Sequence, residues 1–194
     1  MSKLKKTAGF TLIEVMVSMT IGLVVLAAVA GTFTVQLRQN SAEEQLAQMQ
    51  QDVRGALDLM VREIEMAGFK PAGVVFNGIA TSTATTLRIK LDLDSTGVTT
   101  DGATDDISYT YSSGVLTRTL NNPASSATLA DNLTLFSFSY LDANGAATTT
   151  STAVRRITIN ITAQTARADP SYPSNGGKRT YQISADVTPP NLLL

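Results

Sequence analysis

The 194-residue chain contains no cysteine and no histidine. Metal sites built on thiolate or imidazole ligands are therefore excluded, as are disulfides and nucleophiles activated by a histidine. Most classes of enzyme are therefore excluded. Without disulfides, the apolar core has to be the main source of stability. The 43% content of hydrophobic residues is compatible with such a core.

Charge is missing from the 21 residues between Val15 and Val35. At ~1.5 Å per residue this run forms a helix of roughly 31 Å, the thickness of the hydrocarbon core of a bilayer. Lys3, Lys5 and Lys6 precede it, with no acid among the first nine residues. The positive-inside rule therefore predicts a single pass with the N-terminus in the cytoplasm and the rest of the chain across the membrane.

One carboxylate, Glu14, interrupts the start of this apolar segment. A charge within a bilayer costs several kcal/mol, so its presence needs a reason. A secretory signal peptide is one alternative, cleaved after Ala28-Val29-Ala30, but Glu14 would fall inside its hydrophobic region. A plain uncleaved anchor is a second alternative. It explains the length and the lysines, but not Glu14 or the junction between Gly9 and Phe10.

The residues Gly9-Phe10-Thr11-Leu12-Ile13-Glu14, after a short basic leader, resemble the class III signal of type IV prepilins and type II secretion pseudopilins. The resemblance implies that a prepilin peptidase cleaves between Gly9 and Phe10 and methylates the new amine of Phe10. Glu14 would become the fifth residue of the mature chain and act in assembly. The lysines of the leader would supply its positive charge.

The second half of the expected helix is amphipathic. Apolar residues recur at spacings of three and four, which predicts a helix that packs on another element: Leu46, Met49, Val53, Leu57, Met60, Ile64 and Ala67. No proline occurs before Pro71, so one helix can run from Thr11 to Ala67, with Gly68 as its C-terminal cap. Its two halves are a membrane half and an amphipathic half.

After Pro71 the apolar period changes to two, which predicts β-strands. Alternation is visible near residues 87–93, 107–111, 136–140, 157–161 and 181–187, with a hairpin turn at Ser113-Gly114. The segments 81–86 and 146–153 are expected to be exposed loops or edge decoration, and 169–177 a surface loop. The predicted fold class is α+β and pilin-like, with the long N-terminal helix packed on one antiparallel sheet.

Four segments follow from these patterns. Residues 1–9 are the expected leader, 10–35 the transmembrane and filament-core helix, 36–69 the amphipathic helix, and 70–194 a β-rich extracytoplasmic head. Removal of the leader leaves 12 basic and 16 acidic side chains. This balance gives no reason to expect nucleic-acid binding.

The C-terminal half adds a resemblance to PilW-type minor pilins, carried by VREIEMAGF, LDLDSTG, ISYTY, NLTLFSFSYLDANG and VRRITINI. It implies a minor subunit of a type IV pilus, in the inner-membrane complex that primes assembly and later at the cell surface. Its partners would be major and minor pilins, the prepilin peptidase and the assembly platform. A GspJ-type pseudopilin of type II secretion is the alternative.

A membrane-tethered enzyme or binding module is a further alternative, with chemistry limited to Asp92, Asp94, Asp101, Asp105 and Asp106. Without histidine, cysteine or a recognisable partner, these acids do not predict catalysis. Asp92 and Asp94, with Gly97 at the sixth position, partly match a calcium loop. Thr96 and Ala103 depart from that pattern, and a solvated turn is the competing interpretation. No other cofactor is expected.

Overall fold

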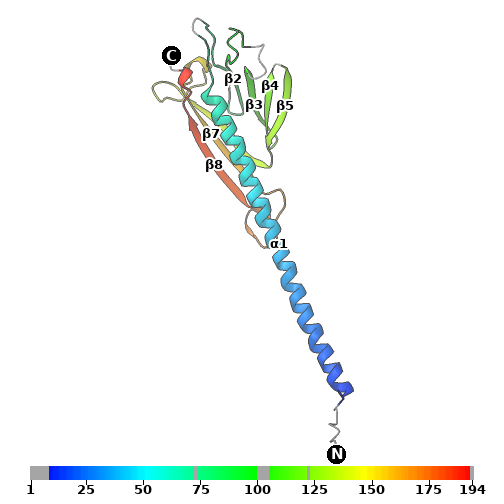
Figure 1. The fold of residues 1–194 in the computed structure, drawn as a ribbon. Helices are drawn as coiled ribbons and strands as arrows, with labels where there is room; N and C mark the ends of the chain where they lie inside the picture. The colour runs from blue at the N-terminus through cyan, green and yellow to red at the C-terminus, as the bar shows by residue number, and fades with distance from the viewer. Residues whose placement is uncertain (1–8, 72–73, 100–104, 122, 193–194) are drawn as a thin grey trace, which may run out of the picture. The chain divides into compact units, whose positions relative to one another are not determined.

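The computed structural model describes residues 9–71, 74–99, 105–121 and 123–192. The chain divides into two compact units, Met1–Glu44 and Gln45–Leu194. Helix α1, Leu12–Glu65, contributes residues to both units. Figure 1 shows the helices and strands in the order of the chain.

In the first unit, α1 exposes nearly all of its side chains up to residue 41. Part of this helix is long and apolar enough to cross a membrane, and none of that part is buried within the protein. Large side chains such as Leu23 and Leu26 are each about two-thirds exposed. An uncharged helix with this much apolar surface requires lipid or other protein around it.

The helix ends at Glu65, two residues before the predicted end. Its last turn tightens, because the amide of Ala67 donates to the carbonyl of Ile64 at 3.0 Å. Gly68 then adopts a φ of 78°, the left-handed conformation that the sequence predicted for a C-terminal cap. The Gly68 amide donates to the carbonyl of Lys90 at 2.8 Å, which ties the end of the helix to the sheet.

In the second unit, the predicted stripe of α1 faces the core. Met49, Val53, Leu57, Met60 and Ile64 are all buried there, as predicted. They pack in one cluster with apolar residues from both sheets. Figure 1 shows β7 and β8 running alongside this half of α1.

The α+β class is confirmed, since α1 packs on antiparallel sheets. The prediction of a single sheet is wrong, because the strands in the described part of the chain form two. The five-stranded sheet has the order β1 (Ile79–Ser82), β2 (Thr86–Lys90), β3 (Asp106–Ser112), β4 (Val115–Asn121) and β5 (Ala124–Ala130). The three-stranded sheet has the order β6 (Leu133–Leu141), β7 (Arg156–Gln164) and β8 (Thr180–Val187).

The two sheets separate at the turn between β5 and β6, where Asn132 adopts a φ of 53°. Isolated backbone hydrogen bonds still connect them, such as Phe138 N–H to the carbonyl of Ala84 at 2.8 Å. Aromatic side chains fill the space between, with the rings of Tyr111 and Phe136 5.4 Å apart. The sheets therefore share one core, although they do not share a continuous hydrogen-bond ladder.

Three expectations about loops have different outcomes. The segment 81–86 is not a plain loop, because Thr81 and Ser82 lie in β1 and Thr86 begins β2. The segment 146–153 is largely irregular, with the short 3-10 helix η1 at Ser151–Ala153. The segment 169–177 contains no strand, as predicted, and includes η2 at Ser174–Gly177. A third turn, η3 at Pro190–Leu192, follows β8.

A buried polar cluster connects α1 to the five-stranded sheet. The Arg118 guanidinium on β4 donates to both carboxylate oxygens of Glu63, with contacts between 2.6 and 3.1 Å. The hydroxyl of Tyr109 on β3 also donates to Glu63. Burial, followed by the negative charge of Glu63, raises the pKa of Tyr109, so it remains a neutral donor. This cluster fixes the helix against the sheet through directional bonds.

Candidate processing and assembly segment

Gly9 and Phe10 lie in irregular backbone just before α1. The Phe10 side chain is 87% exposed, and no heavy atom lies within 4 Å of a Cβ built on Gly9. The peptide bond between them is thus accessible within the described residues. Lys3, Lys5 and Lys6 lie outside the residues that the structure describes, and their role as leader charge stays a prediction.

Glu14 takes part in a capping box at the start of α1. Its Oε2 accepts hydrogen bonds from the backbone N–H of Thr11 at 3.2 Å and from the Thr11 hydroxyl at 3.1 Å. In return, the Glu14 amide donates to Thr11 Oγ1 at 3.3 Å. The Thr-x-x-Glu spacing in the sequence is typical of a capping box, a role that the expected assembly role of Glu14 did not include.

The capping box explains where the helix begins and places a carboxylate near its positive end, which is favourable. It does not conflict with an assembly role, since Glu14 remains exposed. Phe10, Glu14 and Ser18 are four residues apart and line one surface groove with Val15 and Met19. This stripe presents one carboxylate within a largely apolar surface.

Residues 4–30 match the sequence family described as "Prokaryotic N-terminal methylation motif". This match supports a subunit of the pilin or pseudopilin type, which a prepilin peptidase processes and which assembles with other pilins. The motif and the apolar helix also fit membrane anchoring. The match includes Gly9, Phe10 and Glu14, whose individual roles stay predictions.

Among solved structures, the chain is similar to the type IV-like pilin TTHA1219 from Thermus thermophilus. The two chains are 15% identical, and the similarity covers 73% of this chain and 97% of the other, with a TM-score of 0.47. No curated protein matches this chain in sequence.

The predicted calcium residues Asp92 and Asp94 come together with Asp105, and oxygens of the three carboxylates lie within 4.8 Å of one another. Asp92 and Asp105 are buried, whereas Asp94 is exposed. The two oxygens of Asp92 accept backbone N–H groups from Thr96 at 3.1 Å and Gly97 at 2.9 Å. This turn geometry is what the competing interpretation expected, so calcium binding stays a prediction. Ala103 lies outside the described residues.

Among the described residues, Asp106 does not join this group. Asp106 pairs instead with Arg88, whose Nη2 lies 2.5 Å from Asp106 Oδ2. Burial alone would raise the pKa of Asp106, but the hydrogen bond and charge of Arg88 lower it below its usual value. Asp101 lies outside the described residues. The N-terminal motif supports a structural subunit of the pilin or pseudopilin type.

Proposed function

We propose that this chain is a minor pilin, a PilW-like structural subunit of a type IV pilus. In this proposal the N-terminus faces the cytoplasm and the head lies outside the inner membrane. The subunit stays in the membrane with the complex that primes assembly, until it enters the filament. A GspJ-type pseudopilin of type II secretion is the alternative within the same class.

The observation that carries the proposal is the combination of motif and helix. The methylation motif covers 4–30, and the helix that it opens exposes an apolar surface without a partner in its own unit. An enzyme anchor would need only the apolar length. The Gly9-Phe10 junction has a purpose only if the chain is cleaved, and the charge of Glu14, which also caps α1, would serve assembly.

Cleavage after Gly9 would create a positive amine on Phe10, close to the apolar boundary. A pair of unit charges ~4 Å apart gains about 4 kcal/mol at an effective dielectric of 20. This gain offsets much of the several-kcal/mol cost of removing one carboxylate from water. Glu14 could pair with its own amine or with that of a neighbouring subunit. In the second case the pair sets the axial register between helices.

The test compares three variants in the native cell. Glu14→Gln and Glu14→Val should give cleaved, membrane-resident protein that is missing from sheared filaments and from cross-links to other pilins. Thr11→Val is the matched control, because it removes the hydroxyl of the capping box and keeps the carboxylate. The control should enter filaments, which would separate charge pairing from helix capping.

Two results would contradict parts of the proposal. Recovery of the Glu14→Val protein in filaments at the wild-type ratio would show that the carboxylate does not set the register. Absence of the wild-type chain from every sheared filament, with cross-links only to secretion subunits, would favour the pseudopilin.

A further inference from the structure

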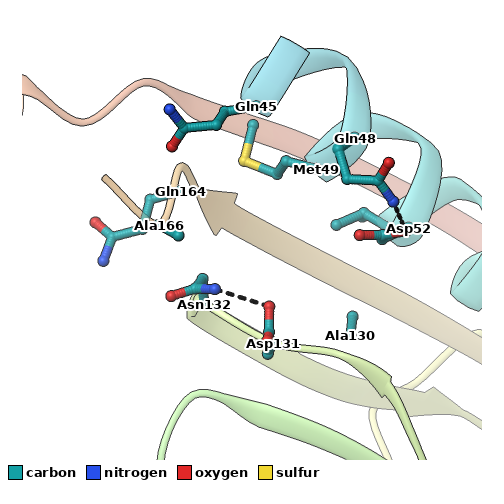
Figure 2. Close-up of a pocket in the computed structure, with 10 residues that line it drawn as sticks. Gln45, Gln48, Met49, Asp52, Ala130, Asp131, Asn132, Gln164 and Ala166 are labelled. Atoms are coloured by element: carbon teal, nitrogen blue, oxygen red, sulfur yellow. Dashed lines mark hydrogen bonds between the residues drawn. The ribbon is translucent and has the colours of Figure 1, made fainter. Parts of the chain in front are cut away.

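A small pocket lies between α1 and the turn that joins β5 to β6, within the second unit. Figure 2 shows α1 residues on one side and residues of the β5–β6 turn on the other. The lining residues are Gln45, Gln48, Met49, Asp52, Val53, Ala130, Asp131, Asn132, Gln164 and Ala166.

The size of the pocket limits what it can hold. Its volume is about 150 Å³. Cavities of roughly that volume accept a benzene-sized group, whereas sites for small-molecule ligands have volumes of at least about 300 Å³. A cofactor or a drug-sized ligand therefore does not fit, but the end of one side chain does.

Two carboxylates at the rim are held in place by neighbouring amides. Gln48 Nε2 donates to Asp52 Oδ1 at 2.8 Å, and Asn132 Nδ2 donates to Asp131 Oδ1 at 2.7 Å. Figure 2 shows both bonds, with the Asp131 carboxylate directed toward the helix. Each amide orients its carboxylate and leaves the second oxygen for a further donor.

The apolar and charged parts of the pocket are arranged for a basic side chain. Met49, Val53 and Ala130 are buried and form an apolar surface. The lining residues include two acids and no base. In the described part of the chain, neither Asp52 nor Asp131 forms an ion pair. Arginine and lysine combine an alkyl stem with a cationic head, which matches both parts.

We propose that this pocket receives the side chain of an arginine or lysine from a neighbouring filament subunit. The alkyl stem would lie on Met49 and Val53, and the cationic head between Asp52 and Asp131. A sugar is a poorer fit, because no aromatic ring lines the pocket to stack on it. The inference rests on the proposed function, since it requires neighbouring subunits, and it adds a charged contact at the head to the contact at Glu14.

The test uses the full chain in cells that assemble filaments. Because the chain lacks cysteine, an Ala166→Cys variant carries a single thiol at the exposed edge of the pocket. Benzophenone maleimide attached there should capture, on illumination, a filament-subunit peptide that contains an arginine or lysine at the contact. Mass spectrometry of the cross-linked peptide identifies that residue.

Asp52→Asn with Asp131→Asn should lower the yield of this cross-link about tenfold, as expected when a paired charge loses its partners. Asp58→Asn is the matched control, since Asp58 is exposed on the same helix and does not line the pocket. It should leave the yield unchanged. Asp52→Lys with Asp131→Lys should abolish the cross-link, and a change of the captured basic residue to glutamate in the neighbouring subunit should restore it.

An unchanged yield in the asparagine variant would overturn the proposal, as would capture of lipid, capture of a segment without a basic residue, or failure of the charge swap. If the chain enters filaments and these results still occur, the pocket proposal alone fails. If the chain with an intact pocket never enters filaments and captures no filament subunit, the proposed function fails with it.

Discussion

Replacing Arg118 with methionine tests the buried connection between helix and sheet. Arg118 and Glu63 side chains are 17% and 11% exposed, and the guanidinium donates to both carboxylate oxygens. Arg118→Met would leave the Glu63 carboxylate buried with Tyr109 as its donor. Breaking a buried ion pair on one side costs about 3–5 kcal/mol. Because both groups retain some exposure, we expect the lower end, about 3 kcal/mol.

A double-mutant cycle separates the pair from packing. Glu63→Met should also destabilise the protein, since it strands the Arg118 guanidinium. The double variant replaces both charges with apolar groups, so its loss should fall short of the sum of the two single losses by at least about 2 kcal/mol.

The assay is urea unfolding of the full chain in detergent, followed by near-ultraviolet circular dichroism of the five tyrosines, since the chain has no tryptophan. Single variants that each lose less than about 1 kcal/mol, with losses that simply add in the double variant, would refute the reasoning. Such a result would mean that water reaches the pair and screens it.

Three further predictions use the same unfolding assay. Gly78→Ala should lower the free energy of unfolding by about 2–3 kcal/mol, because its Cβ would lie 2.5 Å from backbone atoms of Gly68. Gly55→Ala has open space around the new Cβ and should raise the free energy of unfolding by about 1 kcal/mol. Equal effects of the two variants would contradict this prediction. Since the pKa of Asp106 is lowered in the folded state, its stabilisation is present above about pH 4 and is lost as pH falls through the folded pKa. Asp106→Asn should therefore be less stable than wild type at pH 7, with a difference that shrinks in acid; a difference independent of pH would oppose the assignment. If calcium binds the aspartate cluster with a dissociation constant of about 1 mM, 10 mM calcium should raise the free energy of unfolding by about 1.4 kcal/mol. A calorimetric titration that gives no heat at millimolar calcium would instead favour a turn without bound metal.

The helix and its buried stripe could be predicted from the sequence, because the apolar residues that recur at helical spacing over many turns are the ones that the fold buries. Strands with clean alternation, such as Ile157, Ile159 and Ile161 in β7, were predicted for the same reason. Strand β5 was missed, since its residues are mostly alanine, serine and threonine and five of its seven are exposed. It exists because β4 offers a free edge, which local sequence does not record.

Long-range geometry accounts for the other differences. The division into two sheets falls at the turn where Asn132 is left-handed, and apolar periodicity does not record such a backbone conformation. Asp105 lies close to Asp92 although the two residues are 13 positions apart in the sequence. Apolar periodicity does not predict such a contact between polar residues. The capping role of Glu14 follows from its spacing of three residues from Thr11, so the sequence alone is sufficient to predict it.

The central claim is that the chain is processed as a pilin-type subunit, and the mature N-terminus tests it most directly. Intact-mass measurement of the membrane-extracted protein, with fragmentation of its first residues, should find a chain that begins at Phe10 with one N-methyl group. A chain that begins at Gly31, or one that retains Lys3 to Gly9, would contradict the account.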